Sequence, residues 1–269
     1  MTARKNILAS VALLAVVGGV AWQIFRSRVP DPIYEGKHLS YWLERCDIQP
    51  FDAKAAVRDA GTNAIPLLLH YMQVKDFALK RKMIALANKH DLEFPFASAD
   101  YWRYRALFGF IALGADGKSA VPELMRIYEV SIPLDSGFRV LGILDFMGPE
   151  AKEAIPLLLR VATNSNLAYR ENAVHALGQM HVRPEVVVPA LMNCLKDSNP
   201  YVRQQAVRSL GEVGPSAKAA VPGLRELRQS VVHKPDLSMR ETIDKALQKI
   251  DPIAATNAGI AVTNASPAQ

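Results

Sequence analysis

The chain has 269 residues, of which 50% are hydrophobic and 22% are charged, a balance that is typical of a folded protein and excludes a largely disordered one. The formal net charge of +6 makes nucleic acid and anionic membrane surfaces candidate partners. The two cysteines, Cys46 and Cys194, form no C-x-x-C motif, which excludes zinc-ribbon, thioredoxin-like and c-type haem sites. We therefore expect two half-buried thiols without chemistry of their own.

The N-terminal segment predicts export. The 19 residues from Ile7 to Phe25 carry no charge, and Arg4 and Lys5 precede them. A helix of this length is roughly 28 Å long, which matches the hydrocarbon core of a bilayer. We interpret residues 1–28 as a single-pass signal anchor that leaves the rest of the chain outside the cytoplasm, on the periplasmic side. The alternative is a signal peptide cleaved after Gly19-Val20-Ala21, which yields a secreted protein.

The next segment, residues 29–46, predicts a capping helix. Leu39, Trp42, Leu43 and Cys46 follow the spacing i, i+3, i+4, i+7, so a helix that begins at Ser40 presents one apolar stripe. A stacked array of repeats needs such a helix because its first repeat otherwise exposes an apolar face.

The rest of the chain repeats a short phrase that contains proline. Similar stretches begin at Gly61, Gly117, Gly148, Val182 and Gly214, and their prolines are Pro66, Pro122, Pro156, Pro189 and Pro222. The last three intervals are 34, 33 and 33 residues, whereas the first is 56. A period of this length indicates a stacked array. We expect about five repeats over residues 47–250, with an insertion near residues 73–100.

Each repeat has the pattern of two helices joined by a corner. Val202, Ala206, Val207, Leu210 and Val213 recur at helical spacing, as do Val221, Leu224 and Leu227. Gly211 and Gly214 then mark the end of the first helix, and Pro222 lies in the first turn of the second. The predicted fold class is all-α, an α-solenoid of stacked antiparallel helix pairs after the N-terminal transmembrane or signal helix.

Residues 197–214, DSNPYVRQQAVRSLGEVG, resemble the first helix of HEAT-like repeats of the phycobilin-lyase type. A weaker copy, NSNLAYRENAVHALGQM, retains Arg170 but has no aspartate at the matching turn. The resemblance extends over about residues 47–250 and implies that Asp197, Arg203 and Arg170 stack neighbouring repeats. The stretch GKHLSYWL is similar to one that precedes HEAT-like repeats in other exported bacterial proteins.

Two further segments lie outside the repeat pattern. The insertion predicts an extra helix that contains Phe77, Ile84 and Leu86, followed by a loop around Pro95. After a closing helix with Ile243, Leu247 and Ile250, residues 251–269 are small, uncharged apart from Asp251 and without a pattern. We expect this tail to be disordered.

No motif of catalysis, cofactor binding or metal binding occurs in the sequence. The six histidines form no H-E-x-x-H motif, and neither G-x-S-x-G nor a phosphate-binding glycine loop is present. We therefore predict no catalytic, cofactor-binding or metal-binding residues and no enzymatic activity. Functional residues are then expected on the exposed faces of the second helices and in the insertion, where the repeats differ.

Two basic stretches remain as candidate interaction surfaces. Lys80, Arg81 and Lys82 form either a solvated helix face or a surface for phosphates and acidic lipid headgroups. In Tyr101 to Phe110, Arg103 and Arg105 alternate with aromatic residues, a composition that also suits stacking on single-stranded bases. Packing of Trp102, Leu107 and Phe110 in a helix core is the simpler interpretation.

Three functions are consistent with this sequence. The first is a non-catalytic scaffold, tethered to or exported across the membrane, that binds a protein or peptide partner. The second is a nucleic-acid-binding protein resembling the HEAT-like alkylpurine DNA glycosylases, although export separates the chain from that substrate and makes nucleic acid the less favoured partner. The third is a lyase or chaperone for a tetrapyrrole, which only the type of repeat suggests.

Overall fold

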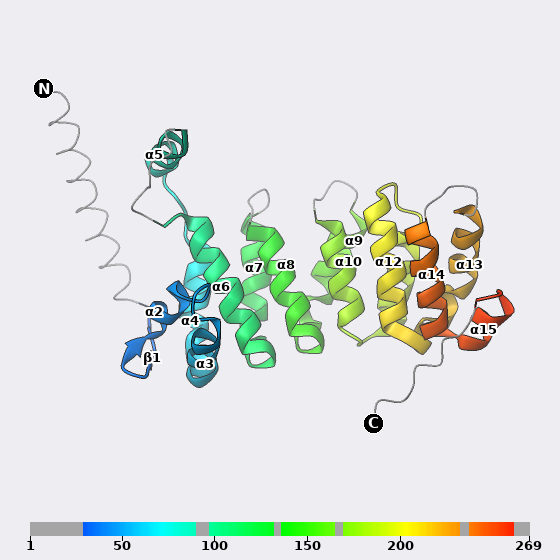
Figure 1. Ribbon diagram of the computed structural model, residues 1–269, viewed down its shortest axis with the longest axis horizontal. Coiled ribbons are helices and arrows are strands. Elements are labelled where there is room, and N and C mark those ends of the chain that lie inside the picture. Colours follow the sequence, from blue (N-terminus) through cyan, green and yellow to red (C-terminus); the bar gives the residue numbers. More distant parts are fainter. Residues whose placement is uncertain (1–28, 90–96, 132–135, 165–168, 232–236, 261–269) are drawn as a thin grey trace, which may run out of the picture. The chain divides into compact units, whose positions relative to one another are not determined.

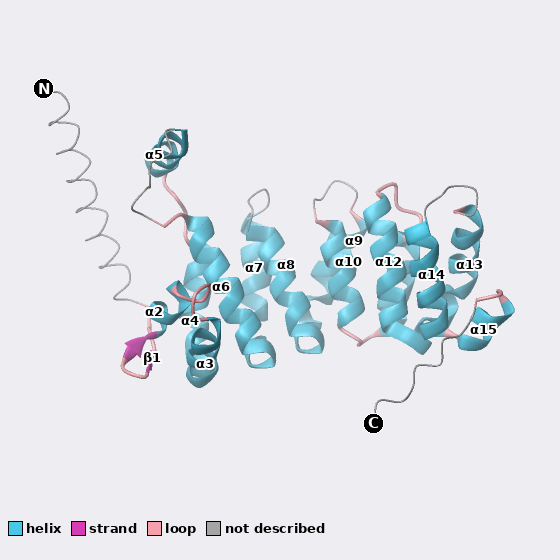
Figure 2. Ribbon diagram, in the orientation of Figure 1, coloured by secondary structure: helices cyan, strands magenta, loops and turns pink. Residues whose placement is uncertain are grey.

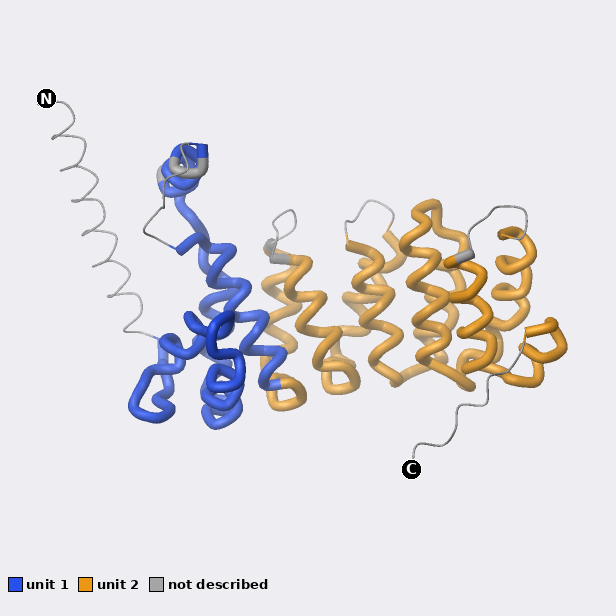
Figure 3. Tube along the Cα trace, in the orientation of Figure 1, with its two compact units in different colours: residues 1–113 blue, residues 114–269 orange. Residues whose placement is uncertain are grey.

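The computed structural model describes residues 29–89, 97–131, 136–164, 169–231 and 237–260. The chain divides into two compact units, Met1–Leu113 and Gly114–Gln269 (Figure 3). None of the helices described in these ranges has the length and apolarity needed to cross a bilayer. The predicted membrane segment, residues 1–28, lies outside the described residues, as do Pro95 and residues 261–269.

The described part of unit 1 is a small hairpin followed by helices (Figure 2). The strands β1 and β2 pair antiparallel, with Ile33 opposite His38. The elements are β1 (Ile33–Tyr34), β2 (Lys37–His38), α2 (Leu39–Glu44), α3 (Pro50–Ala60), α4 (Ile65–Gln73), α5 (Ala78–Lys89) and α6 (Ala99–Leu113).

The predicted capping helix is α2. Its apolar stripe is buried: Leu39 and Leu43 are 0% exposed, and Trp42 and Cys46 are also buried. The predicted start at Ser40 is wrong, because α2 begins at Leu39 and Ser40 is itself buried. The carboxylate of Asp31 accepts the hydrogen bond from the Ser40 amide at 3.0 Å, so a residue from before the hairpin satisfies this helix end.

Unit 2 is an α-solenoid of helix pairs (Figure 1). The first helices α8, α10, α12 and α14 pack side by side, and the second helices α9 and α11 pack on each other behind them. The elements are α7 (Val121–Ser131), α8 (Ser136–Met147), α9 (Ile155–Thr163), α10 (Arg170–Gln179), α11 (Pro184–Cys194), α12 (Pro200–Val213), α13 (Val221–Ser230), α14 (Leu237–Ile250) and α15 (Pro252–Asn257).

The corners before α7, α9 and α13 each begin at a glycine with positive φ and continue as a short 3-10 helix. Gly148 and Gly214 have φ values of 54° and 66°, a conformation that disfavours other residues. Pro222 lies in the first turn of α13, as predicted. In the corner before α7 the glycine with positive φ is Gly114, at 54°. The repeated phrase was predicted to begin at Gly117 instead. The repeated phrase is therefore a structural corner between two helices.

Gly211 does not have the predicted role. It lies within α12, which ends only at Val213. A Cβ atom at Gly211 would lie 3.1 Å from the Cα of Ala246 on α14. The missing side chain thus permits close packing of two first helices, and Gly214 alone forms the turn.

Two other predictions of local structure are wrong. Pro189 lies inside α11, because the second helix of this repeat begins earlier, at Pro184. Residues 252–257 form α15 rather than part of a disordered tail. The Asp251 side chain accepts a hydrogen bond from the Ala254 amide at 3.0 Å, and Ala255 is fully buried. An N-cap and contact with α14 thus order a segment that is too short to show a periodic pattern.

Candidate interaction surface

The structure brings together Asp197, Arg203 and Arg170, the three residues expected to stack repeats. Asp197 lies in the turn between α11 and α12, Arg170 begins α10 and Arg203 is on α12. The Arg170 guanidinium donates to both carboxylate oxygens of Asp197, to Oδ1 at 3.0 Å. Arg203 donates to the Asp197 carbonyl oxygen at 2.7 Å. The turn is therefore linked to the first helices of two successive repeats.

This group of residues is withdrawn from solvent, with only 9% of the Arg170 side chain and 14% of the Asp197 side chain exposed. Burial raises the pKa of Asp197, but the hydrogen bonds from Arg170 and the Asn199 amide outweigh it and lower the pKa below its usual value. The carboxylate is therefore held in its charged form within the stack. Both carboxylate oxygens accept hydrogen bonds from within the chain, the arrangement expected of a structural link between repeats.

The basic cluster of the insertion lies on α5, and its members differ. Lys80 forms an ion pair with Asp76 at 2.7 Å and donates to the Ala97 carbonyl oxygen at 2.7 Å. Arg81 and Lys82 are exposed and pair with no described carboxylate. Lys80 thus holds α5 to its flanking segments, and only the other two remain available for a partner.

The stretch of arginines and aromatic residues in α6 is used inside unit 1. Arg105 is 4% exposed, pairs with Asp47 at 2.6 Å and lies 4.2 Å from the ring centroid of Tyr101. Arg103 donates to the Val74 carbonyl oxygen at 2.9 Å. Trp102 and Phe110 are buried in the core. These interactions occupy the arginines that could otherwise have stacked on bases.

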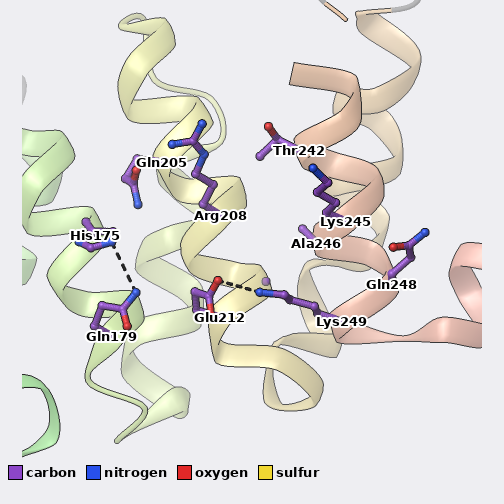
Figure 4. A pocket seen from close by; sticks show the side chains of 11 residues that line it. His175, Gln179, Gln205, Arg208, Glu212, Thr242, Lys245, Ala246, Gln248 and Lys249 are labelled. Carbon is purple, nitrogen blue, oxygen red and sulfur yellow. Dashed lines mark hydrogen bonds and ion pairs between the residues drawn. The ribbon is translucent and has the colours of Figure 1, made fainter. Parts of the chain in front are cut away.

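A groove of about 390 Å³ lies on the first-helix layer of unit 2 (Figure 4). Its floor contains two small residues, Gly211 and Ala246, where α12 and α14 approach each other. Polar side chains from three helices form the walls: His175 and Gln179 from α10, Gln205, Arg208 and Glu212 from α12, and Thr242, Lys245, Gln248 and Lys249 from α14. The groove therefore exists because long polar side chains surround a pair of small ones.

The groove is positively charged, with three cations and one carboxylate in its lining. Lys249 pairs with that carboxylate, Glu212, at 2.8 Å, and Lys245 pairs with Glu241 on its own helix at 2.7 Å. Among the residues that the structure describes, none accepts a hydrogen bond from Arg208. Arg208 is thus the cation in this groove that is free to bind an anionic group from outside.

His175 makes the net charge of the groove dependent on pH. Its Nδ1 lies 2.9 Å from Oδ1 of Asp145 on α8, and its Nε2 lies 3.4 Å from Nε2 of Gln179. The hydrogen bond with Asp145 raises the pKa of His175 above its ordinary 6.5, although burial and the charge of Arg208 oppose this. The groove therefore gains a further positive charge as the pH falls through the raised pKa.

The groove is not where the sequence predicted functional residues. It lies on the first helices, whereas the exposed faces of the second helices and the insertion were expected. The 33-residue period contained a usable signal, because His175 and Arg208 are 33 residues apart, as are Gln179 and Glu212. Polar residues at equivalent positions of successive first helices form one continuous strip when the helices stack.

The two cysteines are buried thiols, and Arg105 Nη1 lies 3.2 Å from the Sγ of Cys46. Cys46 and Cys194 are 3% and 4% exposed, more buried than predicted. Burial raises the pKa of Cys46, and it raises that of Cys194 to about 11. Within the described ranges, no three His, Cys, Asp or Glu side chains are grouped so that they could hold a metal ion.

Comparison with known proteins agrees with this architecture in unit 2. Residues 155–247 match the family model of HEAT repeats. The matched segment covers about a third of the chain. It extends from α9 into α14, so it includes most of the groove and the whole Asp197 turn. The likeness to HEAT repeats is thus shown for residues 155–247, and the narrower phycobilin-lyase type stays a prediction.

Two solved structures of engineered proteins are also similar, each at 15% sequence identity. The first has a TM-score of 0.41, with 80% of this chain and 96% of that chain covered. The second has a TM-score of 0.39, with 84% of this chain and 62% of that chain covered. No curated protein matches the sequence.

Proposed function

We propose that the protein is a non-catalytic HEAT-like scaffold whose first-helix groove binds an acidic segment of a protein partner. We also propose that it is tethered to the membrane with its repeats on the periplasmic side. The observation that carries the proposal is the positively charged groove, in which Arg208 has no described partner. An aspartate or glutamate side chain of a peptide offers the bidentate acceptor that a free guanidinium prefers. The flanking glutamines supply neutral donors and acceptors for peptide groups.

An acidic model peptide tests the groove. We expect a fluorescent glutamate-rich peptide to bind the full chain in mild detergent, and we expect Arg208→Glu to weaken binding about tenfold or more, because removal of a charge-assisted hydrogen bond costs about 1.5–3 kcal/mol. Lys218→Glu is the matched control, since it makes the same charge change at an exposed corner residue outside the groove. Equal weakening by both variants would contradict a specific site.

The same measurement has a pH signature. Because the pKa of His175 lies above 6.5 in the folded chain, binding of the acidic peptide is expected to tighten as the pH is lowered through that raised value. His175→Gln should abolish this pH dependence and retain the binding seen at alkaline pH. Retention of the full pH dependence in that variant would assign it to another group.

The tether and its orientation are tested in cells. After fractionation, we expect the chain with the membranes, and we expect external protease to digest residues 114–269 in intact spheroplasts. Membrane association rests on the uncharged run from Ile7 to Phe25. Protection of the repeats from protease would contradict a periplasmic location. Binding of duplex DNA at physiological salt would then favour the nucleic-acid alternative.

A further inference from the structure

Helix α5 is a surface helix that no other described helix of unit 1 covers. It extends from Ala78 to Lys89 and makes no extensive contact with another described element (Figure 1). The ion pair of Lys80 with Asp76 and its hydrogen bond to Ala97 hold its N-terminal turn. Attachment at one end leaves the side chains described as exposed, among them Leu86 and Lys89, available to a partner.

The chemistry of α5 is that of an interfacial helix. Its sequence, ALKRKMIALANK, contains four cations and no acidic residue. Leu86 is 59% exposed, and Lys82 and Lys89 lie four residues before it and three after it, so both are its neighbours on the helix surface. A large exposed aliphatic side chain flanked by long basic ones suits the boundary between lipid headgroups and acyl chains, where lysine stems lie along apolar surface and their charges reach phosphates.

We propose that α5 binds the surface of an anionic lipid bilayer, with Leu86 in the headgroup region and Lys82 and Lys89 on lipid phosphates. A nucleic acid would use the cations but would gain nothing from Leu86, and an acidic protein surface would leave the same side chain without an apolar partner. The N-terminal apolar run would bring unit 1 to a bilayer, so the inference rests in part on the proposed tether. The inference adds that binding of α5 depends on the charge of the lipids, whereas a tether alone would not depend on it.

The test places an environment-sensitive nitrobenzoxadiazole label at Leu86→Cys in the full chain. The native Cys46 and Cys194 are buried, so an exposed cysteine is labelled selectively. The protein is mixed with phosphatidylcholine vesicles with and without phosphatidylglycerol, and flotation reports membrane association separately. We expect a blue shift of the label only with the anionic vesicles, and no shift from the same label at Ser216→Cys, an exposed residue of unit 2.

Charge removal gives the decisive comparison. At about 1 kcal/mol for each lysine near an anionic surface, Lys82→Gln with Lys89→Gln should move the equilibrium between bound and free α5 about 30-fold toward free. Lys152→Gln with Lys218→Gln, on exposed corners of unit 2, should leave it unchanged. Equal emission in neutral and anionic vesicles, despite flotation with both, would overturn the inference and leave the tether intact. A blue shift caused by duplex DNA but not by vesicles would overturn it in favour of nucleic acid.

Discussion

Replacing Arg170 with methionine is expected to lower the free energy of unfolding of the repeats by about 3 kcal/mol, because removal of one partner from a buried ion pair leaves the other charge without compensation. In the folded chain the Arg170 guanidinium contacts both carboxylate oxygens of Asp197, and both side chains are largely buried. Methionine replaces the aliphatic stem of the arginine but makes no ion pair. At about 2–4 °C for each kcal/mol, the midpoint of thermal unfolding measured by circular dichroism should fall by about 10 °C.

A control and a pH profile make this result specific. Arg160→Met removes an ion pair with Glu129 whose two side chains are more than half exposed, so its expected effect is within about 0.5 kcal/mol. Because the folded chain lowers the pKa of Asp197, the contribution of the pair is present above the ordinary value of 3.8 and is lost as the pH falls through the folded value. The Arg170 variant should lose less stability on acidification than the wild type. A decrease of less than about 1 kcal/mol in the free energy of unfolding at neutral pH would show that the cost of burying the two charges offsets their attraction.

Gly178→Ala is expected to destabilise unit 2 by about 2 kcal/mol, although alanine is the better helix former by about 1 kcal/mol. A Cβ atom at Gly178 would lie 2.6 Å from the Cβ of Ser209 and 2.8 Å from its Cα, so α10 and α12 would have to separate. That separation would also strain the buried hydrogen bond from Ser209 Oγ to the Val174 carbonyl oxygen, which is 2.8 Å long. The midpoint of urea unfolding should decrease.

The matched control is Gly223→Ala on α13. The nearest atom to its new Cβ would be a Leu195 methyl carbon at 3.6 Å, which is an ordinary contact. This variant should gain about 0.5 kcal/mol from helix propensity. If the free energy of unfolding falls in Gly178→Ala and rises in Gly223→Ala, then close packing of the first helices, rather than backbone flexibility, explains the glycine at position 178. A stabilised Gly178→Ala variant would refute that explanation.

The helical repeats and their corners could be predicted from the sequence because both depend on local properties. The spacing of Val202, Ala206 and Leu210 follows the period of the α-helix, and all three are buried. Gly214 and Pro222 favour backbone conformations that are set within a few residues. Errors arose where a neighbouring element decides the outcome: Asp31 at the start of α2, Ala246 beside Gly211, and α14 beside the short helix α15.

The candidate groove could be predicted only in part. The equivalence of His175 and Arg208 follows from the 33-residue period, but their proximity depends on how tightly the first helices stack. The basic composition of α5 was evident, whereas the internal use of Lys80, and of Arg105 in α6, required the contacts with Asp76 and Asp47. A charged residue has the same appearance in the sequence whether or not it has a partner.

The sequence by itself determined the solenoid architecture, since periodic apolar residues, glycine corners and a repeat length of 33 or 34 residues over the last three intervals are local and additive signals. The tertiary structure decided which charges remain available for a partner. Packing of α10, α12 and α14 places Gly211 and Ala246 beneath three cations. It leaves Arg208 without a partner in the described ranges, whereas Arg170 is used internally. The physical reason is that ion pairing depends on distances of a few ångströms between segments far apart in the chain, which no local pattern specifies.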